Sequence, residues 1–402
     1  MKRRDFIGSL GTLGAASLMP TPTASQGTAG ATPTQSRAAF ADLIALLGEL
    51  DRDYLGPARR ITSPTDVSDG HRQIMHHLHL ALSLIAEADP ERPVFRRTVD
   101  PQMKFFGDNP DALYYTAFID PRRSYRISGN IGGADFTSFS FERAGNDGMP
   151  TRGVAFVVDD RDMTIGPNGD FELLIGPEAK PEPWLRLQPG IGMIQTRHYF
   201  EDEKPAGADP LKQIALRIEP LDPPAPRPAP DDASIAASIR HVINFVRETT
   251  IGMPMMQPGK VPPWVSLVPN RFNTAEIPAG DIGFANRSAA YTMAPYALGP
   301  DQALVLEGRF PRCRFANVVL WNRYLQTYDY ETHVISRNRR TTALLPDGRF
   351  RMVIAHRDPG VPNWLDTQGR PSGLVYWRFL LPEEDVAPID AKVVPLAEAR
   401  AL

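Results

Sequence analysis

The chain has 402 residues, enough for two or three domains of ordinary size. Hydrophobic residues make up 42% and charged residues 23%, values that are typical of a globular protein and argue against a disordered one. Forty-four basic and forty-seven acidic residues leave a net charge of −3, which argues against a protein that binds nucleic acid mainly through phosphate contacts.

The first 36 residues are predicted to be an export signal followed by a flexible tether. Arg3 and Arg4 precede Phe6 and a mildly apolar stretch at 7–19, a pattern similar to a twin-arginine signal. The stretch is too short and too rich in glycine to span a bilayer, so we expect no stable membrane anchor. Residues 21–36 have the Thr/Ser/Ala/Gly/Pro composition of a tether. The sequence therefore predicts a periplasmic or extracellular location, reached by the twin-arginine route.

Helical patterns follow in two places. In the region 37–105, apolar residues recur at helical spacing over about 37–54 and again over about 69–87. A proline-rich linker at 221–233 then precedes a helical connector at 234–285, whose helix begins after the capping residues Asp231 and Asp232.

Two segments rich in short strands and turns repeat each other at an offset of 179 residues. Gly129 matches Gly308 and Phe171 matches Phe350, and with two inserted residues Arg197 matches Arg378. Forty prolines and thirty-one glycines suit many turns between short strands and not a helical bundle. We predict a mainly β protein with helical additions, made of two tandem β-sandwich or jelly-roll-like units at 106–220 and 286–402. Helices are expected at the N-terminus and between the units.

Four segments carry a family resemblance. They are DNPDALYYTAFIDPRRSYRISG (108–129), FANVVLWNRYLQTYDY (315–330), SRNRR (336–340) and AHRDPGVPNWLDTQGRPSGLVYWRF (355–379). The chain resembles, over most of 100–395, the bacterial domain-of-unknown-function family numbered 1214. The resemblance implies two β-rich lobes and carries no established reaction.

The first candidate site is a loop in which the second repeat differs from the first. His356, Asp358 and Asp366 are predicted to be catalytic acid–base groups, while Arg357 and Asn363 would hold an anionic or polar group of a ligand. The alternative is a structural loop in which Asp358 caps a turn and Arg357 pairs on the surface. Shared positions such as Arg197 and Arg378 are interpreted as packing or ion-pair residues.

The second candidate is the aromatic stretch 321–330. Asn322 and Tyr324 are predicted to contact an amphipathic ligand, with Arg339 available for an anionic group. Ordinary packing of half-buried strands, or a solvated basic edge, is the alternative for these residues. Asn317 precedes the stretch, and strand alternation places it among core residues.

Metal and cofactor signals are weak. Asp108, Asn109 and Asp111 have the composition of a turn around Pro110 or of an oxygen-rich cation site, and the turn is favoured. The histidines at 71–79 do not converge on a helix, so we predict no metal site, and no cofactor can be named. The lone Cys313 excludes an internal disulfide and is interpreted as a small buried residue.

Two functions stay open. In one, the protein is a hydrolase or lyase that acts on a small organic substrate through His356 with Asp358 or Asp366. In the other, it is a non-catalytic ligand-binding or assembly protein that uses the aromatic stretch. A small-molecule ligand is expected in either case and nucleic acid is not, while the oligomeric state is not predicted.

Overall fold

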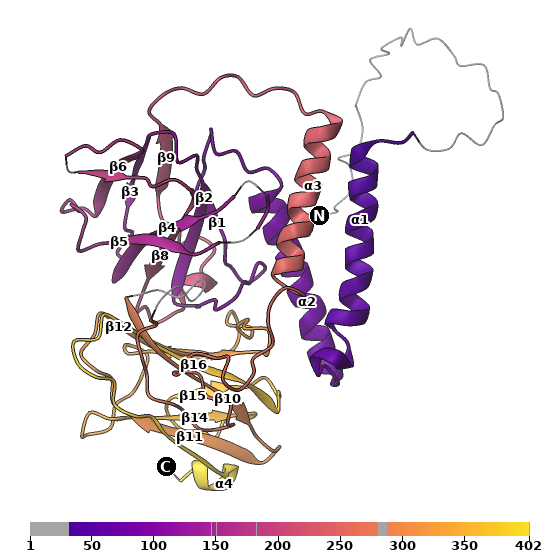
Figure 1. Ribbon diagram of the computed structural model, residues 1–402. Helices are drawn as coiled ribbons and strands as arrows, with labels where there is room; N and C mark the ends of the chain where they lie inside the picture. Colours follow the sequence, from indigo (N-terminus) through magenta and orange to yellow (C-terminus); the bar gives the residue numbers. More distant parts are fainter. Residues whose placement is uncertain (1–31, 146, 150, 182, 280–287, 402) are drawn as a thin grey trace, which may run out of the picture.

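The computed structural model describes residues 32–401 apart from 146, 150, 182 and 280–287. It consists of two β-units, with a layer of helices along one side (Figure 1). The predicted signal, including Arg3 and Arg4, lies outside the described residues. Within the described part, none of the helices has both the length and the apolar character needed to cross a membrane.

Three long helices form the helical layer. They are α1 (Gln35–Glu49), α2 (Pro64–Leu80) and α3 (Asp232–Glu248). The first two continue as π-helical turns at Leu50–Tyr54 and Ala81–Ile85. The second helix begins five residues earlier than the spacing predicts, because the hydroxyl of Ser63 accepts from the Asp66 amide and Pro64 suits a first helical position. Asp231 caps α3 as predicted.

The first β-unit is a sandwich of two sheets, preceded by the short edge strand β1 (Arg96–Arg97). One sheet has the order β1-β2-β8-β4-β5 and the other the order β7-β6-β3-β9. Phe139 and Ile194 from the first sheet pack with Ile127 and Ile175 from the second. The strands are β2 (Ala112–Phe118), β3 (Tyr125–Asn130), β4 (Phe136–Arg143), β5 (Val154–Asp159), β6 (Asp170–Gly176), β7 (Trp184–Arg186), β8 (Ile191–Tyr199) and β9 (Leu216–Pro220).

The second β-unit has the same arrangement. Its sheets have the orders β10-β16-β12-β13 and β15-β14-β11-β17, and a short helix α4 (Leu396–Ala399) follows the last strand. The strands are β10 (Ala289–Ala297), β11 (Gln302–Gly308), β12 (Phe315–Trp321), β13 (Ser336–Asn338), β14 (Phe350–Ala355), β15 (Trp364–Asp366), β16 (Ser372–Leu380) and β17 (Asp390–Pro395).

Strand register confirms the internal repeat. Gly129 pairs with Phe171 in the first unit, and Gly308 pairs with Phe350 in the second. Glycine is needed at both positions for the same steric reason. A Cβ would lie 3.0 Å from the Phe171 ring in one unit and 2.5 Å from the Phe350 ring in the other. The prediction of a mainly β protein with two β-sandwich units and added helices is therefore confirmed.

The segments between the predicted units differ from the sequence prediction in detail. Helix fills only the start of the connector, because α3 ends at Glu248 and residues 249–279 are irregular. Two isolated bridges, Val265 to Met293 and Glu276 to Tyr291, tie this irregular segment to β10.

The two units meet through the outer faces of the sheets that contain β2 and β10. Tyr114, Phe136 and Tyr199 of the first unit belong to the same buried cluster as Tyr291 and Phe315 of the second. The ring centroids of Tyr199 and Phe315 are 5.1 Å apart. A layer of buried side chains thus lies between the units.

Candidate functional site

The structure does not bring the predicted catalytic loop together around His356. The two ring nitrogens of His356 lie 2.5 Å from the Thr367 hydroxyl and 3.4 Å from the Leu298 carbonyl oxygen. Arg357 is exposed and pairs with Asp301. Asp358 is also exposed and accepts the Gly360 amide at 2.7 Å, which is the turn-capping arrangement given above as the alternative.

Asn363 and Asp366 are buried, and their partners are largely local. The Asn363 amide group makes three 2.8 Å hydrogen bonds to the backbone of Ala343 and Arg351, at a backbone φ of 60° that asparagine tolerates. Asp366 accepts the Gln368 amide at 2.7 Å, and its other oxygen lies 2.8 Å from Nδ1 of His333. The histidine beside this carboxylate is therefore His333, which the sequence did not single out.

The aromatic stretch 321–330 packs inside the molecule. The carboxamide oxygen of Asn322 accepts the backbone amides of Tyr324 and Gln326, which closes a turn. Tyr324 donates its hydroxyl to the Asp66 carbonyl of α2 at 2.8 Å, and Tyr328 hydrogen-bonds Tyr296 at 2.7 Å. Both rings are buried. The stretch thereby joins the second β-unit to the helices.

Arg339 joins the two β-units. Its guanidinium makes a bidentate pair with Glu201 of the first unit, with Nε 2.6 Å from Oε1 and Nη2 2.9 Å from Oε2. It also donates to the Cys313 carbonyl at 2.7 Å. Burial raises the pKa of the half-buried Cys313 thiol to about 11, which keeps it protonated at neutral pH.

A group of buried polar residues lies between the units, at positions for which a turn, core packing or an ion pair was the favoured prediction. We call it the interunit cluster, and its members are Asp108, Asn109, Asp111, Asn317, Asn338 and Arg378. All are at most 4% exposed. The residues at 108–111 form the predicted turn, in which the Asn109 side chain accepts the Asp111 amide at 3.1 Å. Among the described residues, no group of three or more metal-ligating side chains of the His, Cys, Asp and Glu types occurs.

Asn317 on β12 connects this turn to the second unit. Its Nδ2 donates to Asn109 Oδ1 at 2.7 Å and to Asp111 Oδ2 at 2.8 Å. Asn338 on β13 donates to the other Asp111 oxygen at 3.4 Å. The Asp111 carboxyl is therefore held by two amide donors, while the Asn109 Nδ2 is buried without a hydrogen-bond partner in the described structure.

Arg378 on β16 is a buried cation among aromatic rings. Its two hydrogen bonds, to Asn317 Oδ1 and to the Gly107 carbonyl, are both 3.4 Å long, and its Nε has no partner in the described structure. The guanidinium carbon lies 5.1 Å from the ring centroid of Tyr376 and 5.8 Å from those of Tyr199 and Tyr291. Rings at these distances stabilise a cation through their π faces.

The equivalent arginine of the first unit is satisfied differently. Arg197 lies opposite Ser138 on β4, as Arg378 lies opposite Asn317 on β12. Arg197 donates to Ser140 at 2.5 Å and to Gln195 at 2.9 Å. By register, the second unit has apolar Val319 in place of Ser140 and aromatic Tyr376 in place of Gln195. The sequence change thus removes hydrogen-bond acceptors from Arg378.

Burial sets the protonation behaviour of the cluster. It raises the pKa of Asp111 to about 7, against the lowering effect of the hydrogen bonds from Asn317 and Asn338. Burial also raises the pKa of Asp108, although Lys104 acts in the opposite direction. A carboxyl that titrates near neutral pH beside a buried guanidinium is an arrangement common at binding and catalytic sites.

The sequence contained a usable signal for this cluster. Arg378 was interpreted as a packing or ion-pair residue because both repeats have an arginine there. Aligning the residues opposite that arginine, Asn317 against Ser138, would have shown that the surroundings changed while the arginine stayed.

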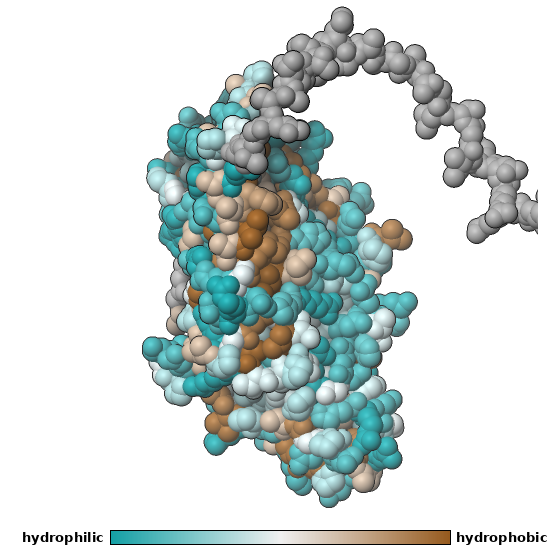
Figure 2. Space-filling view, turned by 90° about the vertical axis from the view of Figure 1, so that its right-hand side faces the viewer, coloured by the Kyte–Doolittle hydropathy of each residue, from teal (hydrophilic) through white to brown (hydrophobic). Residues whose placement is uncertain are grey.

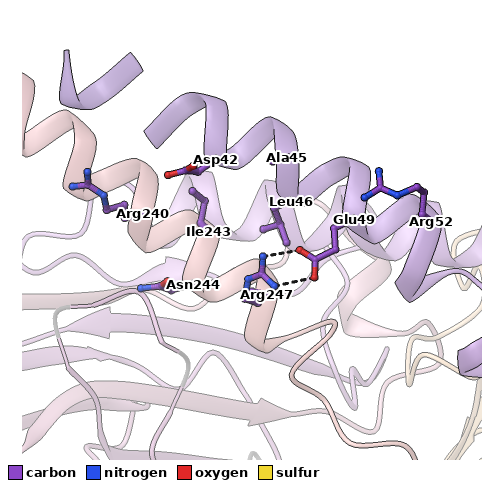
Figure 3. Close-up of a pocket in the computed structure, with 9 residues that line it drawn as sticks. All are labelled: Asp42, Ala45, Leu46, Glu49, Arg52, Arg240, Ile243, Asn244 and Arg247. Atoms are coloured by element: carbon purple, nitrogen blue, oxygen red, sulfur yellow. Dashed lines mark hydrogen bonds and ion pairs between the residues drawn. The ribbon is translucent and has the colours of Figure 1, made fainter. Parts of the chain in front are cut away.

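A shallow groove of about 610 Å³ lies elsewhere, between α1 and α3 (Figure 3). Glu49 and Arg247 cross it with a bidentate ion pair of 3.0 and 2.7 Å, and Arg52 and Arg240 lie at its two ends. Because its principal ion pair is already formed within the protein, we assign it no ligand.

Comparison with known proteins gives the fold and no activity. No protein-family model matches the chain, and no curated protein matches it. A crystal structure of an uncharacterized protein from Burkholderia cenocepacia matches with a TM-score of 0.75 at 24% identity, covering 90% of this chain and 99% of that one. A Vibrio parahaemolyticus protein matches with a TM-score of 0.45 at 11% identity, covering 80% of this chain and 98% of that one. The first likeness shows a shared fold. Membership of family 1214 stays a prediction.

Proposed function

We propose that the protein is an exported ligand-binding protein that holds the carboxylate of a small organic molecule in the interunit cluster. The observation that carries the proposal is Arg378, a buried guanidinium without an ion pair among the described residues.

A buried cation that forms no ion pair is costly to maintain. Desolvating a guanidinium costs several kcal/mol, and two hydrogen bonds of 3.4 Å lie outside the usual range of about 2.7–3.2 Å. Three tyrosine faces offset part of that cost. A carboxylate that pairs with Arg378 would supply the missing charge and the missing short hydrogen bonds.

The unpartnered atoms indicate the chemistry of the ligand. Arg378 Nε and Asn109 Nδ2 are both donors, and Asn317 contacts both residues. Two donors on residues that both contact Asn317 suit an acceptor such as a carboxylate. The surrounding rings of Tyr199, Tyr291 and Tyr376 suit an apolar or aromatic body attached to that carboxylate.

Thermal unfolding in the presence of simple carboxylates tests the proposal. The probes are acetate, succinate, citrate and benzoate at matched ionic strength, with benzamide as the uncharged counterpart of benzoate. We expect at least one carboxylate to raise the unfolding temperature of the wild type, and benzamide to have no effect.

Two matched variants assign the effect to a site. Arg378→Gln should abolish the carboxylate response, while Arg197→Gln should lower the starting stability and keep the response. A response that survives in Arg378→Gln, or a wild type that responds to none of the four carboxylates, would contradict the proposal.

A hydrolase or lyase is the second candidate, and the contact between Asp366 and His333 favours it. The 2.8 Å contact to Nδ1 orients the ring and leaves Nε2 for a substrate, and the His333 side chain is 43% exposed. Hydrolysis of p-nitrophenyl esters by the wild type, lost in His333→Gln and Asp366→Asn and kept in His356→Gln, would establish this candidate. Unchanged rates in the first two variants, or no hydrolysis by the wild type, would count against it.

A further inference from the structure

Helix α1 exposes an apolar stripe that the sequence pattern alone would place in the core. Phe40 is 56% exposed, Ile44 59% and Leu47 36%, while Leu46 and Ala39 on the adjoining side of the helix are buried. The apolar face of α1 is therefore wider than the part of the helix that the other described elements bury. Figure 2 shows a strip of hydrophobic surface running along this side of the molecule.

The spacing of the stripe is that of a coiled-coil seam. Phe40, Ile44 and Leu47 follow one another at intervals of four and three residues, and the same spacing leads to Arg37 before them and to Asp51 after them, in the π-helical turn that continues α1. Both end residues are exposed. The seam thus has an apolar centre, a cation at one end and an anion at the other.

This arrangement is complementary to itself. When two copies of α1 pack antiparallel about a two-fold axis near Ile44, Arg37 of each copy approaches Asp51 of the other. In the same arrangement Phe40 of each copy faces Leu47 of the other. A symmetric dimer needs such a self-complementary surface.

Helix α2 widens the surface. Its His71 contacts Asp51 at 3.0 Å, and Met75 lies one turn further along the same face of α2. Leu82 follows in the π-helical turn that continues α2. Met75 and Leu82 are both exposed, at 62% and 57%. We propose that α1, flanked by Met75 and Leu82, is the interface through which two copies of this chain form an antiparallel, two-fold symmetric dimer.

Sedimentation of the purified protein over a hundredfold concentration range tests the proposal. The wild type should approach the mass of two chains as concentration rises. Ile44→Asp places two like charges at the axis and should weaken association at least tenfold, while Leu211→Asp, a change at a residue 88% exposed in the first unit, should not. Equal unfolding temperatures of both variants would show that neither change disturbs the fold.

A charge exchange tests the pairing itself. Arg37→Asp and Asp51→Arg should each be monomeric alone, because each places like charges together at both ends of the seam. Mixing the two variants should restore a dimer of one copy of each, since every contact then joins opposite charges. A wild type with the mass of one chain throughout, a dimer insensitive to Ile44→Asp, or a mixture that stays monomeric would overturn the proposal.

Discussion

The contribution of Asp111 to the stability of the protein should fall as pH rises from 5 to 7, because its buried carboxyl stays protonated in the folded state over most of that range. In the unfolded chain the carboxyl has an ordinary pKa of 3.8, whereas burial raises its pKa to about 7 in the folded protein. Between these values the folded state keeps a proton that the unfolded state has released. Unfolding therefore releases the Asp111 proton, and the contribution of Asp111 to stability decreases with rising pH until the folded carboxyl is ionised.

The magnitude follows from the two pKa values. Well inside this window each pH unit corresponds to about 1.4 kcal/mol, and because the folded carboxyl is half ionised at pH 7, the change from pH 5 to pH 7 amounts to about 2 kcal/mol. Asp111→Asn removes the titration, while the new amide oxygen can still accept from Asn317. The variant should therefore gain stability relative to the wild type as pH rises, with the gain levelling off above about pH 8.

Urea unfolding of both proteins at pH 5, 6, 7 and 8 measures this difference. Asp358→Asn, at an exposed turn, is the matched control and should show a constant difference from the wild type. If the difference between Asp111→Asn and the wild type were also constant from pH 5 to pH 8, the reasoning about the buried carboxyl would be refuted.

Other predictions concern three further sets of arginines. Arg197→Met should destabilise the protein by about 3 kcal/mol in urea unfolding, because it leaves buried acceptors unpaired. In the same assay Arg378→Met should leave stability equal or raise it by about 1 kcal/mol. Equal losses of stability in both variants would contradict the difference between the two units. Arg339→Ala should lower the free energy of unfolding by about 1–3 kcal/mol, because it removes the bidentate ion pair with Glu201. No loss in the same assay would show that this ion pair does not stabilise the protein. Replacing Arg3 and Arg4 by Lys should leave the precursor in the cytoplasm on cell fractionation, and unchanged delivery would end the twin-arginine prediction.

The fold could be predicted largely because duplication leaves a record in the sequence. The glycine at 129 and its counterpart at 308 each lie against a phenylalanine ring, so the same steric demand marks both repeats. The start of helix α3 could also be predicted locally, from the capping residue Asp231. Exposure of Phe40 and Ile44 could not be predicted, since helical spacing does not say how wide a face the rest of the chain covers.

The candidate site was harder to predict because its residues come from distant segments. His356 and Asp366 are close in sequence, yet strand β15 turns Asp366 toward His333, 33 residues earlier in the chain. Asp111 and Asn317 meet only because the two units pack face to face, a relation that one sequence does not reveal. Proximity along the chain was therefore a poor guide to which polar groups meet.

A crystal structure with the carboxylate that most raises the unfolding temperature tests the central claim most directly. We expect the carboxylate oxygens about 3 Å from Arg378 Nε and Asn109 Nδ2, with the body of the ligand against the tyrosine rings. A saturated crystal with the carboxylate bound only elsewhere, for example in the groove between α1 and α3, would contradict the assignment of the interunit cluster as the binding site.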